Sequence, residues 1–133
     1  MTRLLFCFIF LAFKLPGSFE LKITVKNIQL NQGQVVLAVF ENEKKFLIKP
    51  EASKTRKAGG KSMDFTFNLP QGAYAVSVFQ DLNSNGLLDK GMLGNPTEPY
   101  GFSNNVRPLF SAPEFNACKF SISGATHIAI KLK

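Results

Sequence analysis

The sequence is poor in the residues that build metal centres and covalent cross-links. Its 133 residues include no tryptophan, a single histidine and two cysteines, and the 9 acidic residues are outnumbered by 16 basic ones. So few histidine and cysteine ligands disfavour a transition-metal site. The longest apolar run covers ten residues, which is well short of the roughly 20 that a transmembrane helix requires. A disulfide-rich domain and a membrane bundle are therefore excluded.

The N-terminal segment has the layout of a secretory signal peptide. Arg3 precedes the apolar run at 4–13, and Pro16, Gly17 and Ser18 follow it. We expect cleavage near Ser18, so that residues 1–18 are a signal peptide and 19–133 form one exported domain, periplasmic or extracellular, without a transmembrane anchor. Cleavage also removes Cys7, which leaves Cys118 without a disulfide partner.

The net charge is positive and partly concentrated in one segment. The whole chain carries +7, and loss of the signal peptide lowers this to about +5. Such a charge is compatible with an anionic partner surface, although nothing in the exported chain is a nucleic-acid recognition motif. Either a solvated loop or a binding patch explains the clustered cations, which are Lys44, Lys45, Lys49, Lys54, Arg56, Lys57 and Lys61.

Hydrophobic residues recur with a period of two, which is typical of half-buried β-strands. This alternation predicts strands at 21–27, 63–69, 118–122 and 128–132, and the continuous apolar runs at 35–40 and 73–79 predict two more. A short element at 46–49 is a candidate seventh strand, whereas the rest of 43–61 has the composition of an exposed connection. In NACKFSI, Cys118 alternates with Phe120 and Ile122, so we expect a buried thiol on a strand.

These elements predict an all-β fold. Turns at this spacing, without a sustained helical stripe, are typical of an antiparallel β-sandwich of about seven strands, immunoglobulin-like or transthyretin-like.

The segment DLNSNGLLDKG resembles the first nine positions of a calcium loop. Alternate oxygens around a loop bent at Gly86 converge on one point, as a hard cation requires. The candidate ligands are the side chains of Asp81, Asn83, Asn85 and Asp89 and the carbonyl of Leu87.

The calcium pattern is incomplete. Position twelve is Met92 instead of glutamate, and helices do not flank the loop, so it is not an EF-hand. Glu98 supplies a missing oxygen if the following loop folds back. With so few anions we expect weak calcium affinity, with a Kd of about 10⁻⁴–10⁻³ M. The alternative is that the loop forms Asx turns around Asn85-Gly86 and binds no ion.

Three consecutive motifs carry a resemblance to a known family. The pattern D-x-N-x-N-G-x-x-D, then G-x-P-x-E and Y-G-F-S-N-N, resembles a family of exported bacterial proteins classified only as a domain of unknown function. The resemblance implies a small β-sandwich at the cell envelope and brings no established activity. The Asp-Asn-Gly loop is also similar to those of calcium-binding repeat domains in surface adhesins. The matching residues are Asp81, Asn83, Asn85, Gly86, Asp89, Gly94, Pro96, Glu98, Tyr100, Gly101, Phe102, Ser103, Asn104 and Asn105.

The YGFSNN segment has two interpretations. In the structural one, Tyr100 and Phe102 pack the loop onto the sandwich while Ser103, Asn104 and Asn105 satisfy its backbone. In the functional one, the 92–105 loop is a wall of a binding site in which Tyr100, Phe102, Asn104 and Asn105 contact a ligand, Tyr100 being a stacking surface for a sugar or peptide.

We expect no catalytic activity, because the sequence lacks a nucleophile paired with a base. One hypothesis is an envelope binding module whose calcium-ordered loop presents a surface to a carbohydrate, a peptide or a partner protein. The other is a structural accessory domain in which the loop is an ion-free turn or the ion only rigidifies the fold. A small hydrolase is a distant third.

Overall fold

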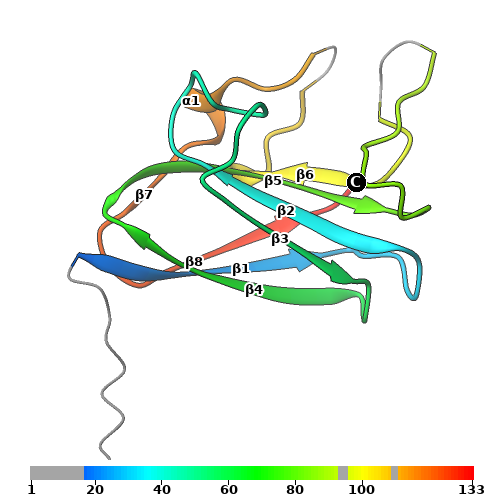
Figure 1. Cartoon of the computed structure of the whole chain (residues 1–133), viewed down its shortest axis with the longest axis horizontal. Helices are drawn as coiled ribbons and strands as arrows, with labels where there is room; N and C mark the ends of the chain where they lie inside the picture. The colour runs from blue at the N-terminus through cyan, green and yellow to red at the C-terminus, as the bar shows by residue number, and fades with distance from the viewer. Residues whose placement is uncertain (1–16, 93–95, 109–110) are drawn as a thin grey trace, which may run out of the picture.

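Two β-sheets packed face to face form the fold, as Figure 1 shows. The computed structural model describes residues 17–92, 96–108 and 111–133. In this part of the chain the strands are β1 (Ser18–Lys26), β2 (Gln34–Phe40), β3 (Ala52–Lys57), β4 (Ser62–Pro70), β5 (Gly72–Asp81), β6 (Tyr100–Phe102), β7 (Phe120–Ile122) and β8 (Thr126–Lys131). A 3-10 turn, η1 (Ser103–Asn105), follows β6, and a short helix, α1 (Phe115–Cys118), precedes β7.

The three-stranded sheet has the order β4-β1-β8, and the five-stranded sheet has the order β3-β2-β5-β6 with β7 also beside β5. All strand pairs are antiparallel except β1 and β8, which run parallel. A parallel pair needs a long connection. Here the chain between β1 and β8 forms the rest of the sandwich, so the prediction of a β-sandwich is confirmed, with eight strands and one parallel pair.

The main core lies between the sheets, and period-two alternation selects its residues. Leu21, Ile23 and Val25 of β1 are completely buried. In β4, buried and exposed residues also alternate along the whole strand. A second apolar cluster, the outer cluster, lies on the far face of the five-stranded sheet beneath α1 and the 41–51 connection (Figure 1). Its buried members are Phe40, Phe46, Ala75, Phe102, Phe115 and Cys118.

Three sequence predictions of local structure were wrong. Residues 46–49 form turns instead of a strand, and Phe46 anchors this connection in the outer cluster. The strand β3 lies within the segment expected to be an exposed connection. Cys118 is buried as predicted, but it ends α1 instead of lying on a strand, and β7 begins only at Phe120.

Two of the clustered cations cover the open edge of the sandwich between β3 and β4. Arg56 donates from Nη1 to the Asp64 carbonyl at 2.7 Å and lies over the Phe65 ring. Lys54 donates to the Thr66 carbonyl and lies over the Phe67 ring. These contacts occupy backbone carbonyls of β4, an edge strand whose unpaired carbonyls could otherwise accept hydrogen bonds from a strand of another chain.

The expected signal peptide falls almost entirely on residues 1–16, outside the described part of the chain. β1 begins at Ser18, where we expect cleavage. Within the ranges that the structure describes, no helix is long and apolar enough to cross a membrane.

Candidate functional site

The loop at 81–89 leaves the end of β5 from a rigid base. Gln80 is completely buried, and its Oε1 accepts from the Gln29 backbone N–H at 2.8 Å. Its Nε2 donates to the Gln29 and Gln32 carbonyls at 2.7 and 2.8 Å, which fastens the 27–33 loop to β5. The alternation in β5 predicts an inward position for residue 80. A glutamine at a buried position requires hydrogen-bond partners, so the sequence contained a sign of this contact that we did not predict.

Asp81 is a completely buried carboxylate that shapes the loop. Its Oδ1 accepts from the Asn85 N–H at 3.2 Å, and its Oδ2 accepts from the Gly86 N–H at 2.8 Å. Gln34 donates from Nε2 to the same Oδ2 at 3.0 Å. Gly86 has φ +79°, which lies in the left-handed region that glycine adopts without strain. Together these bonds close the predicted sharp turn.

Asn83, Asn85 and Asp89 are brought together by this turn. Asn83 donates from Nδ2 to Asp89 Oδ2 at 2.6 Å, and Asn85 donates from Nδ2 to Asp89 Oδ1 at 2.8 Å. The Oδ1 atoms of the two asparagines accept from backbone N–H groups two residues further on, at 3.3 and 2.9 Å. These are Asx turns, as the ion-free alternative expects.

Glu98 folds back onto the loop, which is the condition under which the sequence predicts it as a ligand. Its Oε1 accepts from the Asp89 N–H at 2.8 Å, and its Oε2 accepts from the Leu82 N–H at 2.6 Å. Only 6% of Glu98 is exposed. The carboxylate therefore joins both ends of the loop across a sequence separation of 16 residues. Leu87, whose carbonyl is the remaining candidate ligand, has an exposed side chain.

The loop concentrates negative charge without a cationic partner. The ion pairs among the described residues are Lys22–Asp64 and Lys45–Glu41, so none involves Asp81, Asp89 or Glu98. Backbone and amide N–H groups stabilise the three carboxylates instead. The described part of the chain holds no group of three His, Cys, Asp or Glu side chains arranged to bind a metal. A cation here would thus also need amide or carbonyl oxygens.

Gly33 brings the 27–33 loop against this site. It has φ +63°, and a Cβ atom built there would lie 1.8 Å from the Asp81 carbonyl oxygen. Only a residue without a side chain allows the two backbones to approach so closely. Sequence reasoning missed this contact, because the two segments are far apart in the chain.

Tyr100 and Phe102 lie on the outer face of the five-stranded sheet. Tyr100 is half-buried and pairs with Phe79 in the β5–β6 register. Phe102 is only 9% exposed and belongs to the outer cluster, and the two β6 rings contact edge to face. Phe102 therefore packs the fold, while Tyr100 keeps an accessible side.

Ser103 fills a gap along the edge of β5. β7 pairs with β5 at 72–74 and β6 pairs with it at 77–79, so neither reaches Val76. Ser103 is completely buried, and its Oγ accepts from the Val76 N–H at 2.9 Å and donates to the Cys118 carbonyl at 2.6 Å. Burial raises the pKa of the Cys118 thiol to about 11, which favours a packing role over a nucleophilic one.

Asn104 and Asn105 form side-chain hydrogen bonds with neighbouring backbone segments. Asn104 donates from Nδ2 to the Ala117 and Lys119 carbonyls at 3.2 and 3.0 Å. Asn105 donates to the Ala129 carbonyl at 3.3 Å and accepts from the Lys131 N–H at 3.0 Å, so it covers the edge of β8. The contacts from Phe102 to Asn105 thus favour the structural interpretation of YGFSNN, whereas the contacts at 81–98 leave a candidate ion site.

Comparison with known proteins gives a family without an assigned activity. A model of uncharacterized proteins conserved in bacteria, DUF2141, matches residues 23–129. No curated protein and no solved structure matches the chain. The match begins within β1 and ends within β8, so it covers the sandwich except the start of the first strand and the end of the last one. The chain therefore belongs to the DUF2141 family of uncharacterized bacterial proteins.

Proposed function

We propose that this protein is an exported, non-enzymatic binding module of the cell envelope whose 81–98 region binds Ca²⁺ weakly. One observation carries the proposal: Asp81, Asp89 and Glu98 are held around one loop, and none of them forms an ion pair among the described residues. Asp81 and Glu98 are also buried. Buried carboxylates without a counter-charge are costly, and a bound cation removes that cost.

The donor atoms suit a hard cation. Carboxylate, amide and carbonyl oxygens are the ligands of Ca²⁺, and the loop offers them from Asp81, Asn83, Asn85, Leu87 and Asp89, with Glu98 beside them. Both carboxylate oxygens of Asp89 accept from asparagine side-chain amides of the loop. Calcium binding would replace the two asparagine Nδ2 contacts, so that the amide oxygens turn toward the cation.

A structural domain with an ion-free loop is the second candidate. It is supported by the Asx turns and by the absence of any buried side-chain N or O atom without a hydrogen-bond partner in the described residues. In that case the loop needs no ion to satisfy its polar groups. The two candidates differ in what happens to stability when calcium is added.

The partner surface in this proposal adjoins the loop. Tyr100 follows Glu98 by two residues, and the Tyr100 and Phe79 side chains lie half-buried side by side on the outer face of the sheet. A pair of aromatic rings offers a flat apolar surface for a sugar ring or a peptide side chain. Ordering of 81–98 by calcium would then position Tyr100 for its partner.

Calcium titration calorimetry on the metal-stripped protein tests the proposal. We expect saturable binding with a Kd of about 10⁻⁴–10⁻³ M. At a concentration 100 times Kd, binding stabilises the fold by about 2.7 kcal/mol, which a thermal melt detects. The test variant is Asp89→Asn, because Asp89 is half-buried and its replacement leaves the buried Asp81 in place.

The matched control is Asp64→Asn, an exposed carboxylate on β4 in the other sheet. Binding that Asp89→Asn abolishes and Asp64→Asn keeps supports a site at the loop. No heat and no thermal shift up to about 10 mM calcium, beyond the weak range of extracellular sites, contradicts the proposal and favours the ion-free domain.

A further inference from the structure

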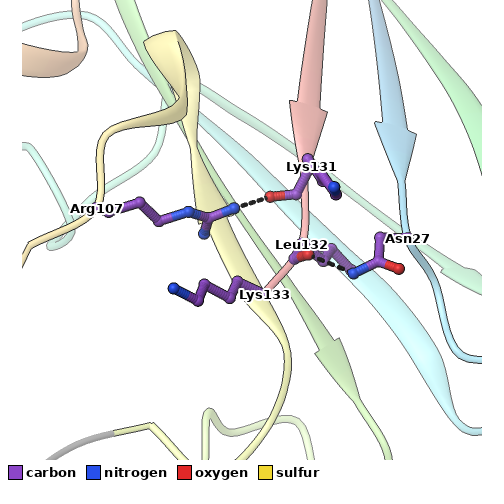
Figure 2. Close-up of a pocket in the computed structure, with 5 residues that line it drawn as sticks. All are labelled: Asn27, Arg107, Lys131, Leu132 and Lys133. Atoms are coloured by element: carbon purple, nitrogen blue, oxygen red, sulfur yellow. Dashed lines mark hydrogen bonds between the residues drawn. The ribbon is translucent and has the colours of Figure 1, made fainter.

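A second charged region lies where the end of β8 meets the segment after η1. A cavity of about 400 Å³ opens there, and it is lined by Asn27, Arg107, Lys131, Leu132 and Lys133. Figure 2 shows the Arg107 side chain reaching the end of β8 and the Lys133 side chain extending on the same side. Three of the five lining residues are cationic and none is acidic, so this basic cavity attracts anions.

Arg107 is held in place by neutral partners. It donates from Nη1 to the Tyr100 carbonyl at 3.2 Å and from Nη2 to the Lys131 carbonyl. A guanidinium has five N–H donors, so donors remain for a ligand. Because carbonyl groups orient the side chain without cancelling its charge, Arg107 is prepared for an anion.

The lysines add charge that the protein does not neutralise. Lys131 lies beside Lys26 in the parallel register of β1 and β8, an arrangement in which like charges repel. The ion pairs in the described part of the chain lie elsewhere, at Lys22–Asp64 and Lys45–Glu41. Neither of these ion pairs involves Lys26, Arg107, Lys131 or Lys133, so this region keeps a positive charge.

The frame of the basic cavity is rigid. The backbones of Tyr100 and Lys133 exchange two hydrogen bonds, at 3.0 and 3.3 Å, which joins the two sheets. Asn27 donates from Nδ2 to the Leu132 carbonyl at 2.7 Å, and the Leu132 N–H donates to the Lys26 carbonyl at 2.9 Å. Backbone and amide contacts therefore fix the backbone that carries both lysines, so only the lysine side chains must be ordered when a ligand binds.

We propose that the basic cavity binds the phosphate group of a small phosphorylated ligand. A phosphate monoester carries a charge of about −1.5 to −2 at pH 7 and offers three acceptor oxygens, so it can accept hydrogen bonds from the oriented Arg107 guanidinium and attract the flexible ammonium groups of Lys131 and Lys133. A carboxylate carries half that charge and is satisfied by the arginine alone. The cavity volume lies near the lower end of the roughly 300–1,000 Å³ typical of ligand pockets, which fits a ligand the size of a sugar phosphate.

The test is a titration of the calcium-free protein with inorganic phosphate and with glucose 6-phosphate at constant ionic strength, followed by calorimetry and by amide NMR shifts. We expect saturable binding with the largest shifts at residues 26–27, 107 and 131–133. The double variant Lys131→Gln/Lys133→Gln should weaken binding at least tenfold. Lys131 and Lys133 are both exposed, so we expect the double variant to keep the fold. An unchanged melting temperature verifies this.

The matched control is Lys54→Gln/Lys57→Gln, which removes two exposed cations from β3. Unchanged binding in this control supports a specific site, and equal weakening in both double variants overturns it as general charge attraction. Absence of saturable binding to either probe also overturns the proposal. Tighter binding of glucose 6-phosphate than of inorganic phosphate assigns the cavity to the sugar phosphate, and equal binding assigns it to the free anion.

Discussion

The segments at 81–98 and 100–105 adjoin in the chain and use their polar residues in different ways. In 81–98 the three acidic side chains gather around one loop, and their partners are backbone N–H groups and the side-chain amides of Gln34, Asn83 and Asn85. In 100–105 the polar side chains are neutral and bond to distant parts of the sandwich, at Val76, Cys118, Ala129 and Lys131.

This difference separates a candidate site from a scaffold. Hydrogen bonds from N–H groups lower the cost of burying a carboxylate but leave its charge, so 81–98 retains an attraction for a cation. Neutral groups that have found their partners retain no such attraction, so 100–105 stabilises the fold. Calcium binding should therefore depend on the first segment, whereas changes in the second segment should lower the unfolding free energy and leave calcium binding unchanged.

The largest expected effect comes from a change that disturbs the base of the first segment. Gly33→Ala places a methyl group 1.8 Å from the Asp81 carbonyl oxygen and strains a positive φ. We expect a loss of about 3 kcal/mol or more of unfolding free energy, measured by urea denaturation. Gly124→Ala is the control, since a Cβ atom there meets nothing within 4 Å. Equal unfolding midpoints for the two variants would show that the 27–33 loop does not support the site.

A smaller loss is expected at the buried serine of the second segment. Ser103→Ala removes the acceptor of the Val76 N–H and the donor to the Cys118 carbonyl, so two buried backbone groups lose a partner. The expected cost is about 2 kcal/mol, with calcium binding unchanged. Ser121→Ala, at an exposed position of β7, is the control for the loss of a hydroxyl group. A calcium affinity that falls with Ser103→Ala would break the distinction between the segments.

Alkaline pH should weaken the packing beneath the second segment. Because burial raises the pKa of the Cys118 thiol from 9.0 to about 11, the folded state keeps the proton that the unfolded state releases first. The stabilisation is complete below about pH 9 and is lost as pH rises through about 11, which amounts to about 2 kcal/mol at pH 11. Urea denaturation at pH 8 and 11 measures it. Cys118→Ala should lack this component, and identical pH profiles would refute the burial argument.

The smallest effect is expected at the surface of the second segment. Asn105 has φ +51°, and its amide satisfies the edge of β8 at Ala129 and Lys131. Asn105→Ala should cost about 1 kcal/mol in a thermal or urea melt. Asn105→Gly removes the same amide without the strain of a positive φ, so it should be the milder change. A greater loss with glycine would show that backbone strain contributes nothing here.

Alternation revealed most of the core from the sequence, but two strands escaped it. β3 has no buried residue and lies at a sheet edge, so its sequence ASKTRK carries no alternating pattern. β6 has only three residues and becomes a strand because β5 is beside it. The predicted alternation through Cys118 crosses from α1 into β7, because both elements place apolar residues against the sandwich.

The candidate ion loop was visible in the sequence because its oxygens are spaced within nine residues. Two of its supports were not, because they come from another segment: Gln34 at Asp81 and Gly33 behind it. The basic cavity gave no sequence signal either, since Asn27 and Arg107 are 80 residues apart in the printed sequence.

By itself the sequence determined the β class, the inward faces of the long strands and the candidate ligands at 81–89, because each depends on the spacing of near neighbours. Tertiary structure alone decided that β1 and β8 run parallel, that Glu98 closes the acidic loop, that YGFSNN fastens strand edges and that three cations line one cavity at the end of β8. The physical reason is that these features arise from which distant segments share a sheet edge, and local spacing does not specify that choice.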